Sequence, residues 1–429
     1  MNKPFPNPAA APLISVIMAN FNGGSHIRKA IQSVLAQTHQ ALELIVSDDG
    51  SQDQSIAIVE EIRENDDRVR LIRSNKSSGP AGARNRAIEA ASGAWVAVVD
   101  SDDIIHPERL ARMLAAADTL QADMVADDLI FFAEDMSESA KTLFQKLDLE
   151  QPEMVDALAL VEGRLAGRDV ALGYAKPLIR RATIGDIRYD TDLRVDEDHD
   201  FYLRLLLSGA TFALIPDAMY LYRRHAASLS HRFSVAKLQP MIAAQKALLQ
   251  ALPDDCKDLR VALARRIENH RRHLNYARFI DALAARQAFK ALGLLLWYPT
   301  SWPLLANTIR ERATRKTHAP AVARSPKKII LSAHGGSPTA DFALVPVPDV
   351  ASAGAGRSAA ATWANLARLS CEHDLHIIAV GRAGAFALGL VPFYGSARVV
   401  NTCQDIHALI ARDNAANQTS GAAQLARSL

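Results

Sequence analysis

Short apolar runs alternate with segments of helical period from residue 13 onward, and this alternation constrains the fold more than any other feature. The runs are rich in β-branched residues and predict four strands, at Ile14–Met18, Leu42–Ser47, Val69–Ile72 and Trp95–Val99. Between the first two strands, apolar residues recur at the spacing of a helix, at Ile27, Ile31, Val34 and Leu35. Repeated strand–helix–strand units predict an α/β fold around a mostly parallel sheet.

Polar and acidic residues directly follow three of these strands, at Asn20–Asn22, Asp48–Asp53 and Asp100–Asp103. Open α/β sheets bind their ligands at the carboxyl ends of parallel strands. We therefore expect the three loops to face one crevice.

The run Asp100-Ser101-Asp102-Asp103 concentrates negative charge at the end of an apolar strand. Neighbouring carboxylates repel one another, and a divalent cation shared with a diphosphate relieves that repulsion. The run therefore indicates a metal–diphosphate site. The alternative is a solvated turn whose aspartates cap a helix that starts near Pro107.

Six motifs follow one another along the chain: Ser15–Met18 with Asn20-Phe21-Asn22, Asp48-Asp49-Gly50-Ser51, Gly82-Ala83-Arg84-Asn85-Arg86, Asp100-Ser101-Asp102-Asp103, Glu197-Asp198-His199-Asp200 with Arg204, and Tyr222-Arg223-Arg224-His225. In their order and spacing, these motifs resemble glycosyltransferase family 2. The resemblance extends over about residues 12–231 and implies the GT-A fold. It also implies transfer of a sugar from a nucleotide-diphosphate sugar.

The resemblance assigns a donor-binding role to five positions. Ala19 and Phe21 would line the base pocket, and Asp49 would accept a hydrogen bond from the base imide, which favours a UDP-sugar. Arg84 would lie near the base and the phosphates, where a guanidinium suits paired oxygens, and Asp100 would contact the ribose or the metal shell. The alternative for Arg84 is a surface arginine on a helix.

The resemblance also implies a metal site. Asp102 would be the direct ligand, and His225 a third ligand or a diphosphate contact. The cation would be Mg²⁺ or Mn²⁺, because both prefer oxygen ligands. A lone histidine such as His225 is otherwise an ordinary surface or core residue.

Transfer needs a base that removes the proton of the acceptor hydroxyl, and Asp198 matches the family's catalytic aspartate. We expect Glu197 to point in a different direction and to cap the helix or bind the acceptor. Lys176 would contact a phosphate of the donor or the acceptor, or else belong to a solvated basic turn. We expect Asp200 and Arg204 to form a structural i,i+4 pair. The alternative for the whole acidic cluster is a helix N-terminus that the macrodipole favours.

Composition excludes other classes of protein. The 429 residues carry 49 Lys+Arg and 47 Asp+Glu, and a net charge of +2 excludes a dedicated nucleic-acid binder. Three cysteines without short-range pairing favour a reducing compartment. The apolar run Leu13–Met18 is too short for a signal peptide, and Ala291–Tyr298 falls short of the roughly 20 residues that span a bilayer. We expect a cytoplasmic location.

The chain divides into five segments: a flexible tail at 1–11, the GT-A domain at 12–231, a basic helical region at 232–316, a linker at 317–328 and a small α/β unit at 329–429. In the last unit we predict strands at Ile329–Leu331, Leu375–Val380 and Ala397–Val400 and helices at Ala359–Ser370 and Asp405–Ala411. The role of this unit is open.

Residues 257–328 contain 16 Lys+Arg and 4 Asp+Glu, together with leucines and two tryptophans, Trp297 and Trp302. This composition is typical of a peripheral membrane contact, which would suit an acceptor linked to polyprenyl diphosphate. The alternative is a helical bundle that packs on the catalytic domain with its basic face in water.

The sequence thus predicts a metal-dependent, inverting glycosyltransferase of surface polysaccharide or exopolysaccharide biosynthesis. It would move a sugar from a UDP-sugar to a hydroxyl group of a glycan or lipid-linked glycan. One alternative is a non-catalytic nucleotide-sugar-binding module of an assembly complex. A nucleotidyltransferase is a second, although Asn20–Gly24 lacks the basic residue of its Gly-rich loop.

Overall fold

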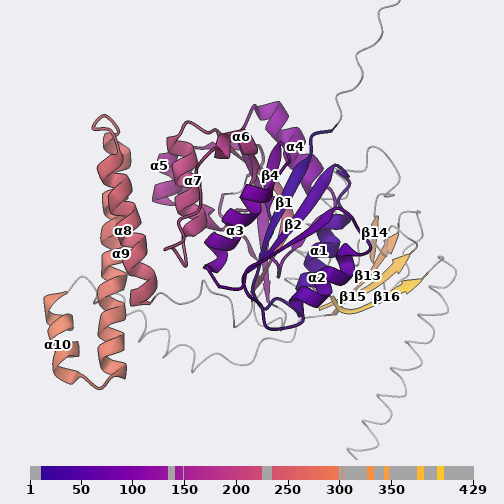
Figure 1. The fold of residues 1–429 in the computed structure, drawn as a ribbon. Coiled ribbons are helices and arrows are strands. Elements are labelled where there is room, and N and C mark those ends of the chain that lie inside the picture. Colours follow the sequence, from indigo (N-terminus) through magenta and orange to yellow (C-terminus); the bar gives the residue numbers. More distant parts are fainter. Residues whose placement is uncertain are drawn as a thin grey trace, which may run out of the picture. The chain divides into compact units, whose positions relative to one another are not determined.

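The computed structural model describes residues 11–133, 141–147, 149–224, 234–298 and 302, and four strands in the C-terminal part. The chain forms two compact units, which we describe separately (Figure 1). The first comprises Met1–Phe131 and Thr142–Ala321, and the second comprises Phe132–Lys141 and Val322–Leu429.

A mixed sheet forms the centre of the first unit, with the order β3-β2-β1-β4-β11-β6-β12-β5. The strands β1, β2, β3 and β4 are parallel, whereas β11 and β12 pair antiparallel to their neighbours. The bounds are β1 Ile14–Asn20, β2 Leu42–Asp48, β3 Val69–Arg73, β4 Trp95–Val98, β5 Ile104–Ile105, β6 Met124–Ala133, β11 Leu178–Arg180 and β12 Phe212–Arg224. The four predicted strands and the predicted α/β fold are confirmed.

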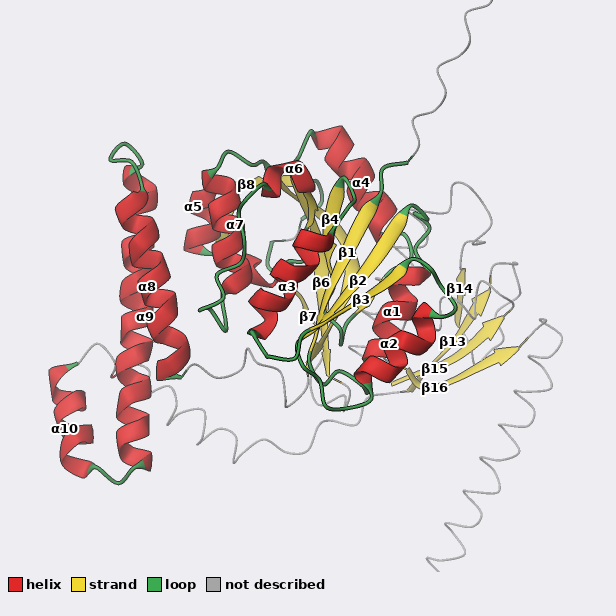
Figure 2. Cartoon of the chain, viewed as in Figure 1, coloured by secondary structure: helices red, strands yellow, loops and turns green. Residues whose placement is uncertain are grey.

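Helices cover both faces of this sheet (Figure 2). Their bounds are α1 Ile27–Leu35, α2 Ser55–Arg63, α3 Gly79–Ala90 and α4 Arg109–Leu120. The helices α1 and α2 lie on one face, and α3 lies on the other. The cause is the strand order, because right-handed crossovers from β1 to β3 run in one direction and the crossover from β3 to β4 runs back.

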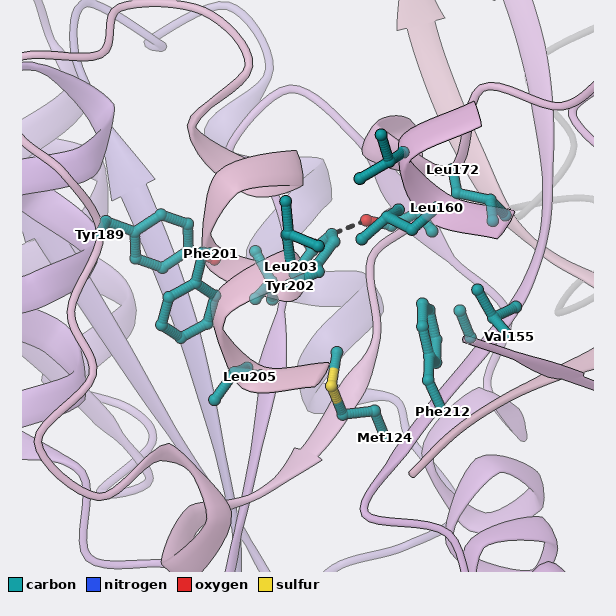
Figure 3. Close-up of a cluster of buried hydrophobic side chains, with 14 of the residues drawn as sticks. Met124, Val155, Leu160, Leu172, Tyr189, Phe201, Tyr202, Leu203, Leu205 and Phe212 are labelled. Carbon is teal, nitrogen blue, oxygen red and sulfur yellow. Dashed lines mark hydrogen bonds between the residues drawn. The ribbon is translucent and has the colours of Figure 1, made fainter. Parts of the chain in front are cut away.

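A second layer of short elements packs beside α3 and carries the acidic cluster of residues 196–200. It contains α5 Ala157–Glu162, β9 Arg164–Leu165, β10 Arg168–Asp169, the 3₁₀ turn η1 Leu172–Tyr174, α6 Arg181–Ile184 and α7 Glu197–Leu207. Two further short strands belong to the central sheet: β7 Lys141–Thr142 pairs with β6, and β8 Glu153–Val155 pairs with β12. Figure 3 shows buried side chains of the second layer, among them Leu160 of α5 and Tyr202 of α7. This core holds α7 against the sheet.

Three helices follow: α8 Val235–Ala251, α9 Lys257–Ala284 and α10 Ala288–Trp297. The helices α8 and α9 form a hairpin, and α9 also packs on α5. The face of α9 that carries Leu263, Ile267, His270 and Leu274 is buried. Within the described part of the chain, no helix has both the length and the hydropathy needed to cross a membrane.

The second unit contains a parallel sheet of the order β14-β13-β15-β16. Its strands are β13 Pro326–Ser332, β14 Ala343–Pro346, β15 Asp374–Val380 and β16 Tyr394–Val400. The three predicted strands are confirmed, and β14 was not predicted. The strand β13 begins at Pro326, so the last three residues of the predicted linker belong to a strand. The helices predicted at 359–370 and 405–411 lie outside the described residues.

Candidate active site

The loops after β1, β2 and β4 meet at one edge of the sheet, as predicted. Residue pairing sets Asn20 opposite Asp48 and Ile17 opposite Val98, so the three strands end at a similar height. The side-chain amide of Asn20 donates to Asp48 at 2.7 Å and to the Ser51 hydroxyl at 3.2 Å. These bonds tie the first two loops together.

The residues predicted to bind the base lie at this edge. Phe21 is 57% exposed and Ala19 is partly buried, so the end of β1 presents an aromatic ring to solvent. Asp49 is buried, and its carboxylate accepts hydrogen bonds from Ser77, Ser78, Gly79 and Arg86. Burial alone would raise the pKa of Asp49, but these bonds outweigh burial and lower it to about 2. Both carboxylate oxygens of Asp49 thus accept hydrogen bonds from residues at and near the start of α3. The contact of Asp49 with a base stays a prediction.

Arg84 lies at the centre of the site, with a side chain only 5% exposed. Its Nη2 is 2.8 Å from Oδ1 of Asp100, and its Nη1 is 2.8 Å from Oε1 of Glu197 and 3.3 Å from Oδ1 of Asp198. Burial opposes the charge of the guanidinium, but the carboxylates outweigh it and raise the pKa of Arg84. The alternative of a surface arginine is therefore wrong.

Lys176 is the second buried cation of the site. Its Nζ lies 2.9 Å from Oδ2 of Asp100 and 2.8 Å from Oδ2 of Asp198. Burial works against its charge, but both carboxylates outweigh burial and raise the pKa of Lys176 well above the ordinary value. The alternative of a solvated basic turn is wrong for this residue. Two cations and three carboxylates form one ion-pair cluster, made of Arg84, Lys176, Asp100, Glu197 and Asp198.

Glu197 and Asp198 do not point in different directions, contrary to the prediction. Both carboxylates reach Nη1 of Arg84, because the first turn of α7 lies directly against this side chain. Burial and the neighbouring Asp198 raise the pKa of Glu197. Oδ1 of Asp198 is buried and, apart from the 3.3 Å ion pair with Arg84, makes no hydrogen bond within the described part of the chain. The predicted structural pair of Asp200 and Arg204 is confirmed at 2.7 Å.

The acidic loop after β4 is held by hydrogen bonds from the strand β12. Asp103 is buried and accepts hydrogen bonds from the Tyr220 hydroxyl at 2.8 Å and the Arg223 amide at 2.7 Å. Asp102 is partly exposed, and its backbone carbonyl accepts a bond from Nε of Arg223 at 2.7 Å. The strand β12 thus braces the loop through Tyr220 and Arg223.

The described part of the chain brings no three His, Cys, Asp or Glu side chains together as a metal centre. Asp100 is engaged by two cations and Asp103 by two hydrogen bonds, and the role of Asp102 as the direct metal ligand stays a prediction. One carboxylate fits a metal whose other ligands are diphosphate oxygens and water. His225 lies outside the described residues.

Sequence reasoning missed three groups that support the site. Arg109 and Asp127 form a buried ion pair at 2.8 Å, and Arg109 also donates to the backbone carbonyl of Lys176. The Tyr189 ring lies beneath the Arg84 guanidinium, 5.5 Å from its centre. Arg266 of α9 pairs with Asp196 at the start of α7. No local pattern marks these residues, because each pairs with a group far away along the chain.

Comparison with known proteins points to one family. Residues 15–156 match the family model described as glycosyl transferase family 2. The succinoglycan biosynthesis protein ExoO of Rhizobium meliloti is 32% identical over 323 residues, which span 73% of this chain and 91% of that protein. The protein ExoU of the same organism is 31% identical over 72% of this chain and 90% of its own length.

These alignments extend beyond the predicted boundary at residue 231. Residues 1–231 are little more than half of the chain, so an alignment over 73% of it must continue through α8 and α9. Among solved structures, Staphylococcus aureus TarS 1-349 in complex with UDP-GlcNAc is similar with a TM-score of 0.50 at 21% identity. That similarity covers 66% of this chain and 79% of that one and concerns the fold alone.

Proposed function

We propose, because the chain belongs to glycosyltransferase family 2, that it moves a sugar from a UDP-sugar to a hydroxyl group of a glycan or lipid-linked glycan in polysaccharide biosynthesis. The observation that carries the proposal is the ion-pair cluster at the carboxyl edge of the sheet. It combines two buried cations that suit a diphosphate with a buried oxygen of Asp198 that lies 3.3 Å from Arg84 and accepts no hydrogen bond from the residues that the structure describes.

Asp198 is the base in this proposal. Its Oδ2 is held by Lys176 and its Oδ1 receives the proton of the acceptor hydroxyl. The acceptor oxygen then forms a bond to the anomeric carbon as the bond from that carbon to the diphosphate oxygen breaks. One displacement of this kind inverts the configuration at the anomeric carbon, and UDP leaves with the electron pair.

Arg84 and Lys176 bind the diphosphate in this proposal, because they are the buried cations at the carboxyl edge. Asp102 would hold Mg²⁺ or Mn²⁺, which would supply positive charge to the departing diphosphate. Phe21 presents its exposed ring to the base, and Asp100 pairs with both cations.

The replacement Asp198→Asn tests the proposal, because it removes the base and preserves the shape of the side chain. We expect sugar transfer to fall by about 100-fold or more, with the affinity for UDP unchanged. The matched control is Asp186→Asn, at an exposed position, which should transfer at the rate of the unaltered protein. Unchanged transfer by Asp198→Asn would remove this residue as base. UDP binding without transfer in the unaltered protein, across a panel of acceptors, would favour the non-catalytic module.

We also propose a peripheral contact of α10 with an anionic membrane surface, which would suit a lipid-linked acceptor. Three large apolar side chains of this helix are exposed: Phe289 at 94%, Leu292 at 55% and Trp297 at 83%. The exposed cations Arg286 and Lys290 lie in or just before the same helix. Apolar and basic side chains together favour the interface of an anionic bilayer.

Sedimentation with vesicles tests this contact. We expect the protein to bind vesicles that contain anionic phospholipid, and the double replacement Phe289→Ser and Trp297→Ser to weaken binding by about tenfold or more. Met154→Ser is the control, because Met154 is 49% exposed in a different part of the unit. Equal binding by the control and the double variant would exclude α10 as the contact.

A further inference from the structure

The hairpin of α8 and α9 contacts Asp196, which lies two residues before the proposed base. Nη2 of Arg266, on α9, lies 3.0 Å from Oδ1 and 2.8 Å from Oδ2 of Asp196. Asp196 is the N-cap of α7, and the next two residues are Glu197 and Asp198 of the ion-pair cluster. The hairpin thus contacts the residue that is adjacent to the cluster along the chain.

Asp196 departs from the usual behaviour of a helix N-cap. An aspartate at this position normally accepts hydrogen bonds from the first backbone amides of its helix. The side chain of Asp196 makes no such bond and turns to Arg266 instead. Its backbone is left-handed, with φ 70° and ψ 9°, a conformation that an L-residue adopts at a cost. The ion pair with Arg266 is the contact that holds Asp196 in this conformation.

Further groups of the hairpin surround this pair. The side-chain amide of Gln245, on α8, lies 3.5 Å from Oδ2 of Asp196, and Nδ1 of His270, on α9, lies 3.1 Å from Oε1 of Gln245. Burial alone would raise the pKa of Asp196, but the charge of Arg266 and the hydrogen bonds outweigh burial and lower it. Asp196 therefore stays ionised and paired.

We infer that Arg266 is a positioning residue for Asp198, and this inference rests on the proposed function. By fixing the left-handed turn at Asp196, Arg266 sets the direction in which α7 starts, and with it the distance from Asp198 to Lys176 and Arg84. Small displacements of a reacting group reduce rates strongly, so this contact acts on the rate of transfer more than on donor binding. The hairpin is accordingly part of the catalytic unit.

Steady-state kinetics of Arg266→Ala test the inference. We expect kcat to fall by about tenfold or more while KM for the nucleotide sugar stays within about twofold. Arg266→Lys keeps the charge but loses the paired donors of the guanidinium, so its kcat should lie between that of Arg266→Ala and that of the unaltered protein. Arg265→Ala is the matched control, because Arg265 is the neighbouring residue and is exposed. Its kcat should equal that of the unaltered protein.

A second variant covers the case in which Arg266→Ala does not fold. Asp196→Asn removes the charge of the partner while keeping a side chain that tolerates the left-handed turn, and we expect the same loss of kcat. An unchanged kcat in Asp196→Asn and Arg266→Lys would overturn the inference.

A double variant separates this inference from the proposed function. If Arg266 acts through Asp198, then Arg266→Ala should not reduce the residual rate of Asp198→Asn any further. An additional tenfold loss in the double variant would overturn the positioning role. Full activity of Asp198→Asn alone would instead overturn the proposed base.

Discussion

The ammonium group of Lys176 lies 2.8 Å from Oδ2 of Asp198, so the proposed base is held by a buried cation. The same ammonium group lies 2.9 Å from Oδ2 of Asp100. Lys176 thus links the acidic loop after β4 to the first turn of α7. Its pKa lies well above the ordinary value, so it stays charged over the whole range in which an enzyme is assayed.

Loss of this cation should impair transfer. In Lys176→Met, Arg84 alone would face three carboxylates, and a carboxylate without its cation holds a proton more tightly. We expect kcat to fall by about tenfold or more and the acidic limb of the pH–rate profile to move to higher pH. Lys176→Arg should keep that limb in place. A limb unmoved in Lys176→Met would contradict the assigned contact with the base.

Asp102 should govern the response to divalent cations. We expect EDTA to abolish transfer and Mn²⁺ or Mg²⁺ to restore it, with about a 100-fold loss in Asp102→Asn. Calorimetry of UDP binding is a second measurement, because the metal-dependent gain in affinity should vanish in Asp102→Asn and persist in Asp118→Asn, at an exposed position of α4. Equal gains in both variants would exclude Asp102 as the ligand.

The buried pair of Arg109 and Asp127 should be sensitive to the loss of one partner. Both side chains are fully buried, so Arg109→Met leaves a carboxylate without its cation and should cost about 3–5 kcal/mol of unfolding free energy. The double replacement with Asp127→Leu should recover most of that loss. Arg112, on the same helix as Arg109, forms a partly exposed pair with Asp217 of β12, so Arg112→Met should cost about 1 kcal/mol or less. Urea denaturation measures all three, and equal losses at Arg109 and Arg112 would contradict the prediction.

His106 should make stability depend on pH. Burial and nearby Arg112 lower the pKa of His106 to about 3, and its Nδ1 accepts a hydrogen bond from the Glu108 amide. Below the ordinary pKa of about 6.5 the unfolded chain binds a proton that the folded protein does not, so stability falls as pH falls towards 3.

The comparison with His106→Asn isolates this contribution, because asparagine offers an acceptor that does not titrate. Between pH 7 and pH 5 the unaltered protein should lose on the order of 2 kcal/mol more unfolding free energy than the variant. Urea denaturation at the two pH values measures the difference. Parallel losses would show that His106 takes up a proton in the folded protein.

The amino-acid sequence was enough to predict the four parallel strands β1 to β4 and the edge at which the polar loops meet. This information is local, because hydrophobic period and turn residues act over a few neighbouring positions. This pattern predicts that β1 and β2 end side by side, and in the structure Asn20 lies opposite Asp48. The family motifs indicated which residues at this edge are candidates for the site.

The ion pairs between distant residues become apparent only in the folded structure. Arg84 and Glu197 are 113 positions apart, and Arg266 and Asp196 are 70 apart, so no local spacing pairs them. Glu197 was expected to point in a different direction from Asp198, and Lys176 was open to a solvated role, yet the folded chain places both in one buried cluster. A buried charge needs an opposite charge or a hydrogen-bond partner nearby. Which partners are near depends on how the whole chain packs, so local sequence does not show it.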